Sequence, residues 1–131
     1  MNDSSADQPG ATNIRRFLPA GSATFDDFLK IDMRVGRITA VEQFPAARKP
    51  AYRLTIDFGI GGVRRSSAQL PPTYPDPNSL VGRLIIAVVN FPARNIAGFQ
   101  SEVLVLGALP SDGSIPLLGV DSGASPGDPI G

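Results

Sequence analysis

The residues of this chain that are best suited to chemistry lie between two apolar runs, residues 84–89 and 103–106. The segment between the runs contains asparagine, proline, arginine and glycine, and it ends on a serine and a glutamate. Polar and basic groups held between buried strands form a binding loop on a rigid scaffold, where small all-β domains place function. Recognition of RNA requires cations for phosphates and polar groups for bases. The candidate RNA-binding residues in this segment are Asn90, Arg94, Ser101 and Glu102.

The same residues also have structural interpretations. Asn90 follows a predicted strand, and an amide in that position often caps the backbone amides of a turn. Ser101 and Glu102 could equally tie the loop to the rest of the domain. Gly98 is expected to supply a backbone angle that only glycine adopts at low cost. The sequence leaves both interpretations open for the three polar residues.

Basic residues are concentrated in the middle of the chain, although the formal net charge of the whole is zero. Residues 34–94 contain nine Arg or Lys and three Asp or Glu, a net charge of +6. The remainder contains three basic and nine acidic residues, a net charge of −6. This asymmetry indicates one face that attracts anions, although solvated strand faces would produce the same count. On such a face, Arg34, Arg64 and Arg65 are further candidates for RNA binding.

Two residue types that support much of enzyme chemistry are missing, because the chain contains no cysteine and no histidine. The lack of cysteine excludes disulfides, thiolate nucleophiles and cysteine-based zinc sites. The lack of histidine removes the commonest general base and the commonest metal ligand. Residues 66–67 are serines without a histidine partner, and the glycines at 59–62 open no helix of a dinucleotide site. We therefore expect a protein that is not an enzyme and that uses no metal or cofactor.

The chain carries no signal for a membrane or for secretion. No apolar run approaches the ~20 residues that cross a bilayer. The first nine residues lack a basic region followed by an apolar stretch, so they do not predict a signal peptide. Together with the lack of cysteine, this leads us to expect a cytoplasmic protein without a membrane span.

Short alternating segments separated by turn residues predict an all-β domain. Residues 1–23 are rich in Ser, Ala, Asp, Gly and Pro, and they predict a flexible leader. Thr24 and Asp27 have the spacing of a capping box and predict a short helix that ends near Ile31. A change of parity near Gly36 predicts a bulge or a bend in the first strand. The expected strands cover residues 33–41, 52–58, 63–69, 84–89, 101–106 and 115–120.

The arrangement of these segments points to an OB-fold. Five main strands are expected, with a proline-rich insert that is not a strand between the third and the fourth. The strand faces and loops of OB-folds bind nucleic acids. We predict that residues 24–131 form a five-stranded OB-fold barrel with a short N-terminal helix and C-terminal strand additions.

Two motifs carry a resemblance to a known family. Residues 32–38, Asp-Met-Arg-Val-Gly-Arg-Ile, resemble the opening motif D-x-R-x-G-x-I of the OB-fold tRNA-binding domain. Residues 89–104 resemble the closing motif of that domain, which is found as an appendix on methionyl-tRNA synthetases and in free-standing tRNA-binding proteins. The resemblance covers about residues 25–131. Three further segments are similar to the CsaA-like export chaperones of this family: residues 44–51, 56–59 and 66–69.

The resemblance implies a homodimer that binds tRNA and, for CsaA-like members, unfolded or precursor polypeptides during export. It places the four residues named above, 90, 94, 101 and 102, at the tRNA-contacting positions of the family. Dimerisation in the family uses the N-terminal helix and the additions around the barrel. The alternative is that these residues serve only to close the open ends of the barrel. Here those residues are Phe25, Phe28, Leu29, Leu117 and Leu118.

Binding of an unfolded polypeptide requires an exposed apolar groove. We expect Phe91 and Phe99, which flank the Arg94 loop, and Phe44 to contribute, although a small domain also needs its aromatic residues for the core. Asn95 stands where a second basic residue is common in CsaA-like proteins, so fewer phosphate contacts are expected. The alternatives are a tRNA-binding protein without chaperone activity and a dimeric module that recruits a larger partner.

Overall fold

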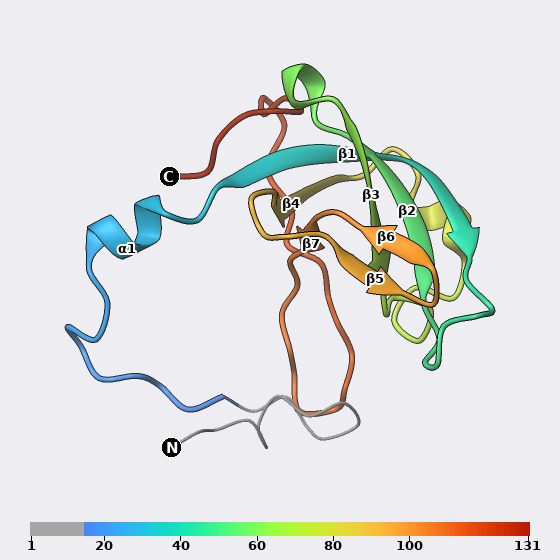
Figure 1. Ribbon diagram of the computed structural model, residues 1–131, viewed down its shortest axis with the longest axis horizontal. Helices are drawn as coiled ribbons and strands as arrows, with labels where there is room; N and C mark the ends of the chain where they lie inside the picture. The colour runs from blue at the N-terminus through green and yellow to red at the C-terminus, as the bar shows by residue number, and fades with distance from the viewer. Residues whose placement is uncertain (1–14) are drawn as a thin grey trace.

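The fold is organised around one long strand whose two halves pair with different neighbours. The computed structural model describes residues 15–131. The N-terminal half of β1 pairs with β4 and its C-terminal half pairs with β2, and all pairings are antiparallel. The order in the sheet is β3-β2-β1-β4-β7 (Figure 1). These strands are β1 (Met33–Gln43), β2 (Tyr52–Asp57), β3 (Val63–Ala68), β4 (Leu84–Val88) and β7 (Leu104–Val105).

The two outer strands of this sheet approach each other and nearly close it. Ser66 in β3 donates its hydroxyl hydrogen to the carbonyl of Val103, just before β7, over 2.8 Å. The Glu102 amide donates to the carbonyl of Arg65, also over 2.8 Å. The result is a nearly closed five-stranded antiparallel barrel with one short helix. This fits an OB-fold-like barrel and confirms the predicted fold class.

The core of the barrel follows from the alternation in β2. Tyr52, Leu54 and Ile56 point inward and are at most 1% exposed, while the residues between them are half-buried. Full burial of a large apolar side chain stabilises the fold by roughly 1.5–3 kcal/mol. The Tyr52 hydroxyl donates to the carbonyl of Tyr74 over 2.8 Å, so its polar end is also satisfied. The remaining buried members of this core are Ile38, Phe58, Leu70, Leu80, Ile85, Ala87 and Val103.

Two short 3₁₀ helices connect the strands. η2 (Gly59–Gly61) turns β2 into β3. η3 (Pro77–Leu80) lies in the proline-rich insert that was expected between the third and fourth strands. The Asp76 side chain accepts a hydrogen bond from the Asn78 amide and so caps η3, and Leu80 from this helix is fully buried in the core.

The one α-helix stands apart from the barrel. α1 (Phe25–Leu29) begins with the predicted capping box, in which Thr24 and Asp27 each accept a hydrogen bond from the other's backbone amide. None of its residues is buried, and Figure 1 shows it held away from the barrel on the chain that leads into β1. Within residues 15–131, no helix is long and apolar enough to cross a bilayer.

Three details differ from the strand predictions. The bulge in β1 lies between Ile38 and Ala40 and not near Gly36, which stays in register with Ile85. Gly36 is buried, and the side chains of Ile56 and Phe58 occupy the space that a side chain at this position would need. The strand expected over 101–106 is reduced to β7. In its place the chain forms a separate hairpin of β5 (Arg94–Ile96) and β6 (Phe99–Ser101).

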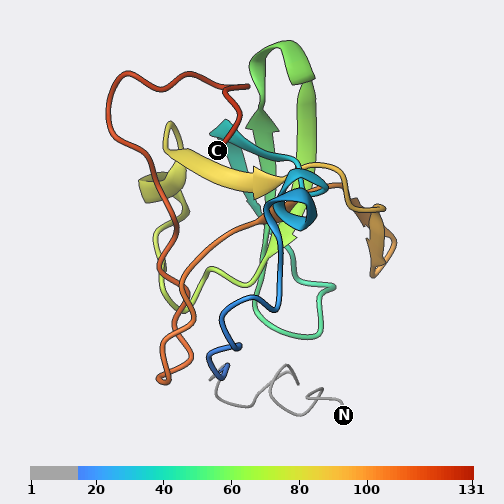
Figure 2. The ribbon, with the colours of Figure 1, turned by 90° about the vertical axis from the view of Figure 1, so that its left-hand side faces the viewer.

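The C-terminal part adds to the barrel without forming a named strand. The strand expected over 115–120 is wrong: its only bridge in the described chain joins Leu117 to Gly107, because Pro116 lacks the N–H that a ladder needs. Residues 127–130 instead lie along the start of β1. There the Val35 amide donates to the main-chain carbonyl of Asp128, and the Ile130 amide donates to the carbonyl of Met33. Figure 2 shows this C-terminal segment (red) passing around one side of the barrel.

The N-terminal prediction falls mostly outside what the structure describes. Residues 1–14 of the expected leader lie outside the described residues. Residues 15–23 are exposed, including Phe17 and Leu18. The boundary at residue 24 agrees with the start of the capping box. The division into leader and domain remains a prediction.

Candidate nucleic-acid interface

The β5–β6 hairpin is fastened to β3 by two of the predicted RNA-binding residues. Ser101 is buried, and its Oγ accepts a hydrogen bond from the Ser67 amide at 3.0 Å. Glu102 Oε1 accepts from the Arg65 amide at 2.9 Å. Both side chains therefore tie the loop down, which was one of the two interpretations that their positions allowed.

The turn of the hairpin depends on Asn95 and Gly98. Asn95 Oδ1 accepts a hydrogen bond from the Gly98 amide at 2.9 Å. Gly98 has a φ of 84° and Ala97 a φ of 50°, so both lie in the left-handed region, which confirms the backbone role expected for Gly98. The asparagine that replaces a second basic residue thus shapes the turn beside Arg94.

Two arginines stack on a pair of aromatic rings beside this hairpin. Phe44 and Phe99 pack edge to face with ring centroids 5.4 Å apart. The guanidinium of Arg65 lies 4.8 Å from the Phe99 centroid, and that of Arg53 lies 5.4 Å from the Phe44 centroid. Such contacts hold a guanidinium in place while it keeps its charge. We call these four residues the arginine platform.

One carboxylate partly neutralises the arginine platform. Glu42 Oε1 lies 2.7 Å from Arg65 Nη2 and 3.9 Å from Arg53 Nε. Arg53 Nε is buried and is the single buried side-chain nitrogen or oxygen without a hydrogen-bond partner in the described chain. The Glu42–Arg65 pair is about half exposed, so it contributes at most about 1 kcal/mol to stability. Arg65 can therefore exchange Glu42 for a phosphate at modest cost.

The structure corrects the expected exposure of two peptide-binding candidates. Phe44 and Phe99 are 6% and 9% exposed, because their rings pack together under the arginines. They do not line an exposed apolar groove. Phe91 is 44% exposed and is the one candidate of the three that presents its ring to solvent.

Arg94 is the freest basic residue of the predicted set. It lies on β5 opposite Ser101, it is exposed, and its side chain forms no hydrogen bond or ion pair with any residue of the described chain. Arg65 has a side chain that is 41% exposed. These two arginines reach the surface on the two sides of β6 and are available to phosphates.

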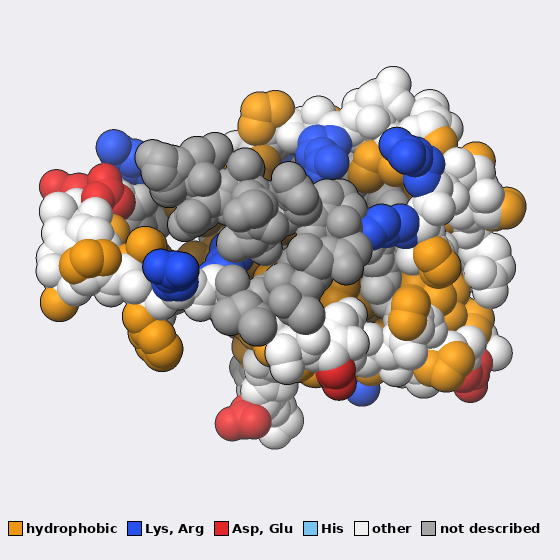
Figure 3. Space-filling model, turned by 90° about the horizontal axis from the view of Figure 1, so that it is seen from below, with side chains coloured by type: hydrophobic (Ala, Val, Ile, Leu, Met, Phe, Trp, Pro, Cys, Tyr) orange, Lys and Arg blue, Asp and Glu red, His pale blue; other side chains and the backbone are white. Residues whose placement is uncertain are grey.

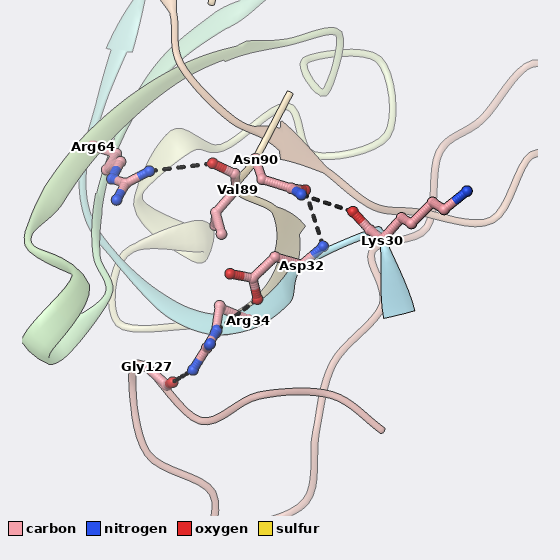
Figure 4. Close-up of polar contacts among 7 residues, drawn as sticks. All are labelled: Lys30, Asp32, Arg34, Arg64, Val89, Asn90 and Gly127. Atoms are coloured by element: carbon pink, nitrogen blue, oxygen red, sulfur yellow. Dashed lines mark hydrogen bonds and ion pairs between the residues drawn. The ribbon is translucent and has the colours of Figure 1, made fainter. Parts of the chain in front are cut away.

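Three other predicted residues gather at a different place, near the start of β1 (Figure 4). Asn90 Oδ1 accepts from the Asp32 amide at 2.9 Å, and its Nδ2 donates to the Lys30 carbonyl at 2.8 Å. Asn90 thus joins the end of β4 to the chain between α1 and β1, which is its structural interpretation. Arg34 and Arg64 lie close by and are held by main-chain carbonyls.

The predicted dimer residues are mostly exposed. Phe25 and Leu29 of α1 are 70% and 61% exposed, and Phe28 is half-buried and stacks on Phe25. Leu118 is 39% exposed and Leu117 is half-buried. Figure 3 shows hydrophobic side chains (orange) at the left end of the molecule, where α1 lies, with charged side chains beside them. Their role in a dimer remains a prediction.

Comparison with known proteins decides the family. A family model described as a putative tRNA binding domain matches residues 33–129. The chain belongs to this tRNA-binding domain family. The match begins at the start of β1 and extends through the C-terminal segment that pairs with it.

Relatives of this tRNA-binding domain include enzymes and chaperones. A methionine–tRNA ligase of Neisseria meningitidis serogroup A is 42% identical over 124 residues, which are 94% of this chain and 18% of the ligase. The chain thus spans less than a fifth of that relative. The solved structure of the chaperone CsaA from Bacillus anthracis is 48% identical, with a TM-score of 0.80, covering 85% of this chain and all of CsaA. CsaA from Picrophilus torridus is 52% identical, with a TM-score of 0.76, over 83% and 99%.

Sequence reasoning did not select Glu42, Arg53 or Asp32, although each belongs to the charged clusters of this tRNA-binding domain. Glu42 and Arg53 are direct partners in the β1–β2 register, and opposite charges across strands attract each other. That register was not available from the sequence, because it depends on the bulge between Ile38 and Ala40. Within the described residues, no three acidic side chains gather as a metal site would require.

Proposed function

We propose that this chain is a non-catalytic cytoplasmic protein that binds tRNA. The carrying observation is that Arg94 is exposed on β5 and that the side chain of Arg65 on β3 is 41% exposed, while Ser101 and Glu102 fasten the β5–β6 hairpin to β3. The Phe99 ring and Glu42 hold the Arg65 guanidinium, so part of its side-chain freedom is lost before a phosphate binds, and Arg94 stands on a hairpin that is tied to the barrel. The family and the relation to methionine–tRNA ligases favour tRNA as the source of those phosphates.

The test is a titration of the purified protein with bulk tRNA at two salt concentrations. Binding should be tight at low salt, and log K should fall with log salt by roughly 0.7–0.9 for each phosphate neutralised. The slope of log K against log salt gives the number of phosphate contacts. It therefore shows whether a loop with one arginine, Arg94, makes fewer contacts than a loop with two basic residues. Absence of binding at low salt would overturn the proposal.

A second function is favoured by the similarity to CsaA over nearly the whole of those chaperones. We propose that the protein forms a homodimer through α1 and residues 117–118 and that it binds unfolded or export-destined polypeptides. Exposed apolar side chains support this second proposal, because unfolded clients present apolar segments. Those side chains include Phe91 near the hairpin and Phe25 and Leu29 on α1.

Phe91→Ser is expected to weaken the suppression of client aggregation without unfolding the domain. Loss of an exposed ring that buries against a client removes about 1.5 kcal/mol or more, so about tenfold more variant should be needed. Light scattering of a chemically unfolded client measures this. Phe17→Ser removes a fully exposed ring from the segment before α1 and serves as the control. If wild-type protein gives no suppression at one dimer per client, the chaperone proposal is wrong.

A further inference from the structure

A second cluster of basic residues lies at the end of the barrel where β1 begins, and it surrounds a cavity of about 200 Å³. The cavity combines charged and apolar walls, contributed by β1, η2, β3, the end of β4 and the C-terminal segment. Its principal lining residues are Asp32, Arg34, Phe58, Ile60, Arg64 and Val89. We call it the β1-end pocket.

Both arginines of the β1-end pocket are held by the main chain. Arg34 Nη1 donates to the Gly127 carbonyl at 3.1 Å, and its Nε donates to Asp32 Oδ1 at 2.7 Å (Figure 4). Arg64 donates from Nη1 to the Val89 carbonyl at 3.2 Å and from Nε to the Gly61 carbonyl at 3.3 Å. Carbonyl groups orient a guanidinium without cancelling its charge, so the pocket keeps a net charge of about +1 with Asp32 included.

These arginines retain donors for a ligand. A guanidinium has five N–H groups, and each arginine uses two nitrogens for the contacts above, which leaves its Nη2 group without a partner in the described chain. Two guanidiniums that line one cavity, each with an unpartnered Nη2 group, have the donors that the oxygens of a phosphate require. Their side-chain entropy is already lost before a ligand arrives.

The apolar wall of the pocket favours an anionic group that is part of a larger ligand with an apolar or aromatic face. Ile60 projects from η2 and is 99% exposed, and Val89 is half-buried beside it in the lining. An exposed aliphatic side chain on a short, hydrogen-bonded turn next to a phosphate site can pack against the flat face of a nucleobase. A lone inorganic ion would gain nothing from it.

We propose that the β1-end pocket binds one phosphate of an RNA nucleotide between Arg34 and Arg64, with the attached nucleoside packed against Ile60. This inference rests on the proposed tRNA binding and adds a second anchoring point, separate from the hairpin arginines. Asp32 is a positioning residue in it, since its carboxylate aligns Arg34. The C-terminal segment supplies the carbonyl of Gly127, so the tail that pairs with β1 also completes the pocket.

The test titrates the folded full-length chain with uridine 5′-monophosphate or with uridine. Binding of each probe is measured from the NMR chemical shifts of the backbone amides. Uridine 5′-monophosphate should shift the amides of Asp32, Gly61, Val89 and Gly127 with saturation. Uridine should bind at least about tenfold more weakly, because it lacks the charged group that the arginines hold. Equal binding of the two probes would overturn the proposal.

Variants locate the site. Arg64→Gln should weaken the nucleotide about tenfold, and Arg48→Gln, which removes the same charge from the exposed loop between β1 and β2, should not. Ile60→Ser changes an exposed side chain that the fold does not need, and it should weaken the nucleotide about threefold while leaving binding of inorganic phosphate unchanged. This second variant keeps the proposal testable if Arg64→Gln fails to fold.

Parallel titrations separate this proposal from the proposed function. If tRNA binds while the nucleotide shifts no amide of the pocket, the pocket proposal is wrong and tRNA binding stands. If the nucleotide saturates the pocket while tRNA does not bind, the pocket stands and the proposed function fails. An acetylated tripeptide with a free carboxylate that binds the pocket more tightly than the nucleotide would overturn the assignment to phosphate.

Discussion

Replacing Arg65 and Arg94 together by glutamine is expected to weaken tRNA binding by about 100-fold at low salt. Each substitution removes a charge-assisted contact to phosphate, which is worth about tenfold or more in affinity. The slope of log K against log salt should become shallower by about 1.5, because two phosphates are no longer neutralised. Fluorescence titration with labelled tRNA at four salt concentrations measures both quantities.

Arg83→Gln is the control for the loss of one positive charge, to be compared with Arg65→Gln and Arg94→Gln singly. The Arg83 guanidinium stacks 5.0 Å from the Tyr74 ring and belongs to a different surface, so one positive charge is lost without disturbing the hairpin. Circular dichroism must show that Arg65→Gln keeps the fold, since Arg65 also covers Phe99. A salt slope that is the same for the double variant and the wild type would remove both arginines from the interface.

Gly36→Ala is expected to destabilise the barrel by about 2–3 kcal/mol. A Cβ at this position would lie 2.6 Å from Cγ2 of Ile56 and 2.7 Å from Cε1 of Phe58. Both neighbours are at most 2% exposed and have no room to move, so overpacking is not relieved. Urea unfolding followed by circular dichroism should show a lower midpoint with an unchanged slope.

Gly119→Ala is the comparison variant, and it is not expected to lower the free energy of unfolding. Gly119 is exposed, and an added Cβ there would meet only a carbonyl oxygen at 3.7 Å, an ordinary contact. Its replacement should leave stability unchanged or raise it by about 0.4–1 kcal/mol, because alanine has less freedom in the unfolded chain. Equal effects of the two substitutions would show that Gly36 is not sterically required.

The local structural features of this protein, such as its helix cap and the alternation in β2, were predictable because each depends on residues that are neighbours in the chain. Thr24 and Asp27 form their capping box within one helical turn, and the alternation of Tyr52, Leu54 and Ile56 directly sets which side of β2 enters the core. The left-handed backbone at Gly98 follows from the same kind of local requirement. The two family motifs, residues 32–38 and 89–104, also stand in the sequence itself.

Predictions that depended on partners distant in the chain were less successful. The proline at 116 prevents a final strand, and the last pairing to β1 is made instead by residues 127–130, whose composition resembles a loop. Phe44 and Phe99 were candidates for peptide binding or for the core, and the structure places them in a second small core under Arg53 and Arg65. An aromatic residue in a loop gives no indication of whether a distant guanidinium will cover it.

The class of the protein could be read from the sequence: an all-β barrel of the tRNA-binding domain family, with a basic middle segment and a polar loop between two strands. How the basic residues divide between two places on the surface depended on the folded chain. The fold placed Arg94 on the β5–β6 hairpin with Arg65 on the neighbouring strand β3, and it placed Arg34 with Arg64 around the β1-end pocket. It also showed that Asn90, Ser101 and Glu102 hold the main chain. The physical reason is that charge and polarity are properties of single residues, whereas a site is made by register, closure and the carbonyls that orient each side chain.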